Sequence, residues 1–297
     1  MTGRERGFLL LASHLGDPAR KPLTGPQLRS LAQRVREMEV DDPNRDLTEG
    51  DLMALGYGQA MAARIVGLLS EEERLDHYLA RGKRAGCVCV TRVSREYPVL
   101  LRQRLGLDAP ALLWCRGDLR LLNTPGVALV GSRDLAEENR RFAAEVGKQA
   151  VQQGLSLISG NARGADRTAQ DAALDAGGSV ISIVADELAG HPIRDRVLWV
   201  SEDGFAEPFS AQRALSRNHI IHALGWRTFV AQTRAKMGGT WDGTVKNLRF
   251  GWSEVYCFDD GSQGCDLLCR MGAFPVKTED LRDFAALPAR EQSLFEQ

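Results

Sequence analysis

Three short apolar runs, separated by two longer segments, occupy the middle of the chain. The runs lie at residues 127–130, 155–158 and 180–184, and turn residues flank them. Such runs are too short for helices and are typical of strands buried on both faces of a parallel sheet. The first intervening segment, 136–153, repeats its apolar side chains with a helical period and is followed by Gly154, a typical residue at a helix end. The second segment is rich in alanine. The pattern predicts a βαβαβ unit.

Similar apolar runs recur on both sides of this unit. Further strands are predicted at residues 86–91, 111–115, 197–200, 228–231, 255–258 and 274–276. Helices are predicted at 217–224 and from the glycine turn at 238–240 through Phe250. Alternation of strands and helices favours an α/β fold. We therefore expect a Rossmann-like, mostly parallel sheet with helices on both faces.

The first 80 residues differ because their pattern is helical throughout. Residues 7–15 follow a basic start, but His14 interrupts the apolar stretch and no small-residue cleavage site follows. This favours a first helix over a signal peptide. We predict a small helical domain at 1–80 that is dispensable for the fold of a Rossmann-type domain at 81–297.

Within this helical domain, residues 52–58 followed by 62–65 resemble a helix-hairpin-helix. Apolar positions lead into Gly56-Tyr57-Gly58, and a second helix carries Ala62 and Ile65 inward. In that motif the glycines let backbone amides meet a DNA phosphate. A plain helical hairpin with a glycine turn gives the same pattern, so both interpretations stay open.

Two glycine-rich turns follow adjacent predicted strands. Gly131-Ser132-Arg133 follows the first strand of the central unit, and the stretch 159–166 follows the second. Open α/β sheets bind ligands at the carboxyl ends of their strands, so both turns should face one crevice. Glycines, helix N-termini and the two arginines, Arg133 and Arg163, suit a phosphate or phosphodiester. The alternative is that these turns need Gly and Ser for their geometry alone.

Composition places few limits on function. The chain has 297 residues, of which 43% are hydrophobic and 26% charged, and a formal net charge of -1. This is ordinary globular composition without the overall positive charge of many nucleic-acid binders. Residues 209–253 nevertheless hold seven Lys and Arg against the single acid Asp242, which predicts a local basic patch at the crevice.

Cysteine usage and hydropathy favour the cytoplasm. The six cysteines contain no Cys-x2-Cys pair and no His at ligand spacing, so we expect free thiols and neither disulfides nor a metal site. No apolar run is long enough to span a membrane.

After Gly131 the sequence does not continue as a dinucleotide fingerprint, and no P-loop motif occurs. We therefore expect no cofactor and no ATP hydrolysis.

A series of short motifs occurs in a recognisable order. VALVGSR is followed by GLSLISGNARGAD, GGSVISIV, SEDG, SRNHIIHAL and GCDLLCRMGA. In this order the motifs resemble the DNA-processing protein A family (DprA, also called Smf). The resemblance covers residues 85–276, and the helical front end is similar to that family's N-terminal domain.

The resemblance implies a non-enzymatic protein that binds single-stranded DNA, forms a homodimer and helps to load a RecA-type recombinase during natural transformation. No residue is then catalytic. By position, the resemblance assigns to the DNA-facing pocket Gly131, Ser132, Arg133, Ser159, Gly160, Gly164, Asp166, Arg217 and Asn218. The residue pattern adds Arg163 and the glycine turn at Gly238 and Gly239.

Several positions depart from the family pattern. The usual Arg-Asn-Arg is Arg217-Asn218-His219, and the Phe-Pro expected before it is Ala214-Leu215. The link from His191 to Ser201 is short, so we expect a connecting helix to be missing. No C-terminal winged-helix domain is expected after residue 297. A divergent branch acting in DNA maintenance or phage defence is therefore an open alternative to transformation.

A second hypothesis is a nucleotide-binding sensor or a phosphoribohydrolase-like enzyme of the same superfamily. The motif of those enzymes is a glycine turn followed by a catalytic Glu. Here the turn at 237–244 has the glycines but no Glu, which leaves Asp242 or Glu202 as the candidate carboxylate.

Overall fold

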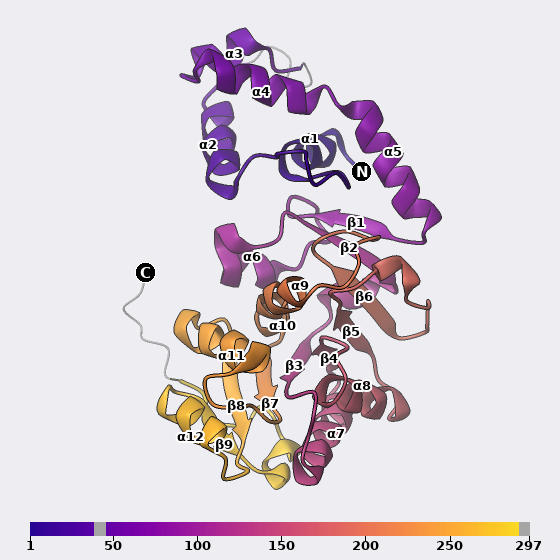
Figure 1. Cartoon of the computed structure of the whole chain (residues 1–297), viewed down its shortest axis with the longest axis vertical. Helices are drawn as coiled ribbons and strands as arrows, with labels where there is room; N and C mark the ends of the chain where they lie inside the picture. Colours follow the sequence, from indigo (N-terminus) through magenta and orange to yellow (C-terminus); the bar gives the residue numbers. More distant parts are fainter. Residues whose placement is uncertain (39–45, 291–297) are drawn as a thin grey trace.

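A single mixed sheet organises the molecule. The computed structural model describes residues 1–38 and 46–290. Within them, nine strands lie in the order β1-β2-β6-β5-β4-β3-β7-β8-β9 (Figure 1). Their bounds are β1 Val88–Thr91, β2 Leu112–Gly117, β3 Gly126–Val130, β4 Ser156–Ser159, β5 Val180–Ile183, β6 Val197–Ser201, β7 Arg227–Val230, β8 Glu254–Phe258 and β9 Phe274–Val276. The sheet is parallel from β6 to β9, whereas β1 and β2 pair antiparallel at one edge.

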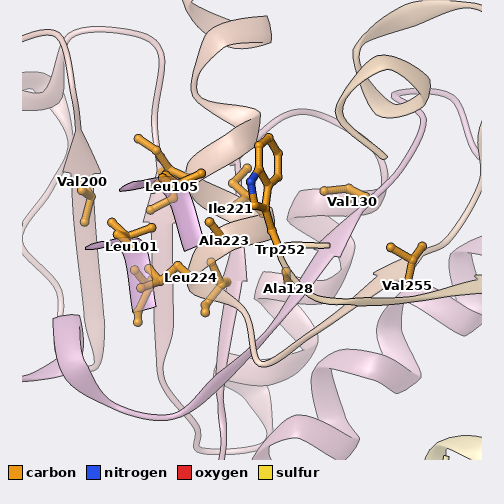
Figure 2. Close-up of a cluster of buried hydrophobic side chains, with 14 of the residues drawn as sticks. Leu101, Leu105, Ala128, Val130, Val200, Ile221, Ala223, Leu224, Trp252 and Val255 are labelled. Atoms are coloured by element: carbon orange, nitrogen blue, oxygen red, sulfur yellow. The ribbon is translucent and has the colours of Figure 1, made fainter. Parts of the chain in front are cut away.

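Helices cover both faces of this sheet. They are α1 Gly3–Ala12, α2 Gly25–Arg36, α3 Glu49–Ala54, α4 Gln59–Leu69, α5 Glu72–Arg84, α6 Val99–Leu105, α7 Glu137–Gln152, α8 Ala165–Asp175, α9 Ala211–Ser216, α10 Asn218–Leu224, α11 Gly238–Phe250 and α12 Gln263–Arg270. One apolar core joins α6, α10, α11 and α12 to the sheet (Figure 2), and a second joins α7 and α8 to the opposite face. The predicted α/β fold and its strands are confirmed.

The connection from β5 to β6 contains no α-helix, unlike most parallel crossovers. Only one 3-10 turn, Leu188–Gly190, lies between them, so the expected loss of a connecting helix is confirmed. This leaves the sheet face beside β5 and β6 open to another element. The helical front end fills that place, because its apolar side chains join those of β2 and β6 in a third core.

The front end is tightly joined to the sheet. The predicted boundary at residue 80 falls inside α5, whose Tyr78 packs edge-on against Trp114 of β2 with ring centroids 5.3 Å apart. Gly82 lies so close to the Trp114 indole that no Cβ would fit between them. Leu9 and Leu10 of α1 belong to the same core. The expectation that residues 1–80 are dispensable for the sheet therefore conflicts with the packing.

The predicted helical hairpin is present in the front end. Helices α3 and α4 enclose a turn in which Gly56 has φ +83°, a conformation that favours glycine. Arg34 of α2 donates a hydrogen bond to the carbonyl oxygen of Leu55 and lies over the Tyr57 ring, 4.7 Å from its centroid. These contacts account for a packed hairpin, and its contact with DNA stays a prediction.

Two further findings concern the cysteines and the possibility of a membrane-spanning helix. All six cysteines are free thiols. Among the residues that the structure describes, none of the helices has the length and apolar character needed to cross a membrane.

Removing residues 1–80 should destabilise the sheet domain. The deletion uncovers Trp114 and its apolar neighbours on β2 and β6, and a large exposed apolar patch promotes aggregation. We expect an insoluble product, or a soluble one with a much lower melting temperature than the full chain. Thermal unfolding followed by circular dichroism measures this. A monomeric deletion variant with an unchanged melting temperature would contradict the shared core.

Candidate anion-binding site

An open cleft lies at the carboxyl ends of β3, β4 and β7. It has a volume of about 410 Å³. The first predicted turn, 131–134, lines it, together with the junction between α9 and α10 and the loop that runs from β7 into α11. This is the edge of the sheet at which parallel α/β folds hold their ligands. The predicted crevice is therefore present, and a third loop completes it.

The first turn is held rigidly by its neighbours. The backbone amide of Ser132 donates to the carbonyl oxygen of Gln232 at 3.0 Å, and that of Ala165 donates to the carbonyl oxygen of Ser132 at 3.1 Å. The Thr240 hydroxyl donates to the carbonyl oxygen of Gly131 at 3.0 Å. Gly131 must be glycine, since an added Cβ would lie 2.5 Å from the Cβ of Ala165.

Arg133 projects from this rigid turn into solvent at the cleft. Its side chain is exposed, and its guanidinium makes no hydrogen bond or ion pair with any residue of 1–38 or 46–290. The acidic residues that could pair with Arg133 have other partners: Asp134 pairs with Arg163, Asp166 lies near Arg217, and Glu202 lies near His219. Arg133 is thus available for an anion.

The second turn packs directly against the first. Gly164 has φ +88°, and a Cβ there would collide with the carbonyl oxygens of Ser132 and Arg133. Gly160 is equally constrained, because a Cβ would meet the guanidinium of Arg217. Both glycines are buried. Because neither residue has a side chain, the two turns can come into contact. This packing explains why glycine is needed at both positions, and no ligand has to be invoked.

The amides of the second turn already have an acceptor. Asp166 is buried and accepts hydrogen bonds from the backbone amides of Gly160 and Ala162, at 3.1 and 3.2 Å. Ser159, fully buried, lies beside the same carboxylate. Burial raises the pKa of Asp166, while the nearby positive charge of Arg217 opposes this shift. Asp166 therefore stabilises the turn itself, whereas the buried Oγ of Ser159 has no hydrogen-bond partner among the described residues.

Arg217 forms part of the cleft floor. Only 6% of the residue is exposed; its Nη2 donates to the carbonyl oxygen of Gly160 at 2.9 Å and its Nη1 to the Asn218 Oδ1 at 2.8 Å. Burial lowers the pKa of Arg217, and Asp166, 3.9 Å away, counteracts this. The Nε of Arg217 has no partner within the described part of the chain. One guanidinium therefore anchors the turn and still places positive charge below the cleft.

The loop before α11 supplies the third wall. Gly238 has φ +82° and is exposed, and no side chain caps the N-terminus of this 13-residue helix. An uncapped helix N-terminus offers unpaired N–H groups and the positive end of the helix dipole. The Asn218 Nδ2 donates to the carbonyl oxygen of Gly239 at 3.1 Å and so fixes this loop to α10.

Two further residues of this loop were missed by sequence reasoning. Arg234 is exposed, lines the cleft and makes no side-chain ion pair among the described residues. Thr233 is 5% exposed, and its Oγ1 lacks a hydrogen-bond partner there although the residue lines the same cleft. The basic stretch 209–253 contained the signal for Arg234. No sequence feature distinguishes Thr233 from an ordinary loop residue.

The structure brings the predicted site residues into one region, but only some of them face the cleft. Arg133, Ser132, Asn218, Gly238 and Gly239 face or border the cleft. Ser159, Gly160, Gly164 and Asp166 are buried, and of these only Asp166 also lines the cleft. Arg163 lies on an adjoining hollow, where it forms an exposed ion pair with Asp134 at 2.6 Å, and such exposed pairs contribute little stability.

The predicted basic patch is smaller at the cleft than the sequence suggests. Arg213 pairs with Glu207 at 3.0 Å and with Asp203 at 3.5 Å, away from the first turn. Arg227 is buried beneath the Trp226 ring. Of the seven basic residues in 209–253, Arg217 and Arg234 line the cleft, and Lys236 is exposed in the same loop.

The carboxylates considered for an enzyme lie elsewhere. Asp242 lines a hollow on the far side of Asn218, and Glu202 lines another hollow beside the front end. Burial raises the pKa of Glu202, and its Oε2 lies 3.7 Å from Nε2 of His219. Neither carboxylate borders the cleft that contains Arg133.

Comparison with known families agrees with this arrangement. The sequence model of the DNA recombination-mediator protein A family matches residues 88–285, which include every strand of the sheet and all of the cleft. The chain belongs to this family. The resemblance noted from the motif order is therefore confirmed.

Individual relatives in the family show the same relationship. The DNA processing protein DprA of Streptococcus pneumoniae is 32% identical over 179 residues, which cover 56% of this chain and 63% of that protein. Protein Smf of Escherichia coli is 30% identical over 185 residues, or 57% of this chain and 49% of that protein. The match thus spans less than two thirds of either relative.

Solved structures extend the likeness in fold to the front end. DprA from Streptococcus pneumoniae superposes with a TM-score of 0.69 and 24% identity, over 90% of this chain and 95% of that one. DprA from Helicobacter pylori, described with its single-stranded DNA binding mode, gives a TM-score of 0.55 and 19% identity, over 66% of this chain and 94% of that one.

Gly164→Ala should destabilise the protein by more than Gly238→Ala. Both glycines have positive φ, so both variants carry a conformational cost of about 1–3 kcal/mol. The added Cβ at Gly164 also collides with two carbonyl oxygens, whereas nothing lies within 4 Å at Gly238. We expect an additional loss of about 1–3 kcal/mol for Gly164→Ala. Urea denaturation of the two variants measures the difference. Equal losses would show that the turns do not depend on close contact.

Proposed function

We propose that the chain binds single-stranded DNA in this cleft through its phosphate groups and performs no catalysis. The observation that carries the proposal is the combination of Arg133 and Arg234, both exposed and without an ion pair in the described structure, with the uncapped N-terminus of α11. Arginine presents a planar fork of donors that matches phosphate oxygens. A helix N-terminus adds a second, fixed source of positive potential.

The size and shape of the cleft favour a flexible strand. A volume of about 410 Å³ is within the range of pockets that hold small ligands, and the cleft is open to solvent. A single strand can bend to place a phosphate between the loops. A stiff duplex has less freedom to do so. Membership of the family and the printed description of the Helicobacter pylori structure support the same ligand class.

The carboxylates around the cleft argue against hydrolysis. Asp166 is buried and accepts two backbone hydrogen bonds, and Asp134 is paired with Arg163. A general base must be free to accept a proton from its substrate, and both side chains are already engaged by these partners. A free nucleotide could still occupy the same anion subsite as a sensor ligand. Competition between oligonucleotide and mononucleotides separates these two functions.

Partners beyond DNA remain predictions from the family resemblance. A homodimer, a contact with a RecA-type recombinase, and a role in transformation or in DNA maintenance do not depend on the cleft geometry described above. We propose them only as consequences of family membership.

Arg133→Ala should weaken binding of single-stranded DNA about equally for all sequences. Phosphate contacts fix the position of a strand but do not read its bases. Loss of one contact should also make the plot of log affinity against log salt concentration shallower by about 0.7. Fluorescence anisotropy over a salt series measures both effects.

The matched control is Arg120→Ala. Arg120 is also exposed, but it pairs with Asp118 in the segment that leads into β3, at the opposite edge of the sheet. It should leave the slope unchanged. An unchanged slope for Arg133→Ala, or the same change for both variants, would overturn the assignment of phosphate binding to this cleft.

A further inference from the structure

A second hollow adjoins the cleft. It has a volume of about 360 Å³ and shares Leu215 and Asn218 with the cleft, so these residues form a ridge between the two spaces. Helix α11 runs beside both, with its N-terminus at the cleft and its last residue, Phe250, at the hollow. A chain that leaves the cleft across this ridge enters the hollow directly.

The hollow has an aromatic wall. Phe250 is 59% exposed and stacks on Trp252, with ring centroids 5.6 Å apart and an interplanar angle of 17°. Trp252 is only 9% exposed and belongs to the same core as Ile221 of α10 and Val255 of β8 (Figure 2). A buried indole thus supports an exposed phenyl ring. Such a supported ring is a rigid surface for stacking.

Charges around this wall are arranged unevenly. Asp108 and Asp242 lie in the hollow itself, and they disfavour a phosphate there. Lys246 lines the hollow from one turn earlier on α11. The exposed guanidinium of Arg249 lies over the Phe250 ring, 5.3 Å from its centroid, so a base that stacks there takes its place or stacks on the guanidinium plane. An uncharged planar group inside the hollow avoids repulsion by the two aspartates. Phosphates outside it can then lie near Lys246 and Arg249.

We infer that the hollow receives a base of the DNA strand whose phosphates occupy the cleft, and that the base stacks on Phe250. This inference rests on the proposed function. Base–aromatic stacking tolerates any base, because every base has a π-face, and basic side chains beside it follow the backbone. The cleft and the hollow would then form one path along α11, with phosphate contacts at its start and stacking at its end.

The test combines Phe250 variants with strands that lack bases. Phe250→Ala should weaken binding of a long oligothymidylate by about five- to a hundredfold, the range found for loss of one stacked base. Phe250→Tyr should retain affinity. Phe250→Leu, which keeps apolar bulk without a π-face, should lose most of it. On a matched abasic strand, the difference between the wild type and Phe250→Ala should shrink to within about twofold.

Ile193→Ala is the control for loss of an exposed apolar side chain. Ile193 is 63% exposed and does not line the cleft or the hollow. Equal losses for Phe250→Ala on base-bearing and abasic strands, or no loss on either, would overturn the stacking subsite. Full affinity of Phe250→Ala together with weak binding by Arg133→Ala would reject this inference alone. Failure of the wild type to bind any oligonucleotide would reject the proposed function as well.

Discussion

Close contact between the two turns that follow β3 and β4 is the constraint on which the rest of the site depends. Gly164 lies against the carbonyl oxygens of Ser132 and Arg133, so the backbone of one turn supports the other without an intervening side chain. The first turn is also hydrogen-bonded to Gln232, in the loop that leads towards α11. Three loops are therefore held as one rigid rim, and a rigid rim can bind an anion without first being ordered.

The buried charged residues and the exposed charged residues have different roles in the site. Asp166 and Arg217 satisfy the backbone of the second turn and partly compensate each other, which limits the cost of burying both. Because those amides already bind Asp166, the positive potential available to a ligand comes from Arg133, Arg234 and the N-terminus of α11, with Arg217 below them. On this account, affinity is set by a few exposed side chains, and their geometry by buried ones.

Much of this arrangement follows from local sequence pattern. Short apolar runs located the strands, and their order placed the turns of Arg133 and Gly164 at one edge, since parallel strands share a carboxyl edge. The pattern could not separate glycines that contact a ligand from glycines that contact another turn, because the difference for Gly160 and Gly164 lies in a neighbour distant in sequence. The shared core of the front end was missed for the same reason: Trp114 meets Tyr78 only in three dimensions.

Direct binding by the wild-type chain tests the central claim most simply. Fluorescence anisotropy would compare a labelled oligothymidylate with the matching duplex, using unlabelled mononucleotides as competitors. The account predicts saturable binding of the single strand that weakens with salt, weaker binding of the duplex, and little competition by mononucleotides, which can fill one phosphate position only. Tighter binding of the duplex, or complete displacement of the strand by a mononucleotide at low concentration, would contradict it.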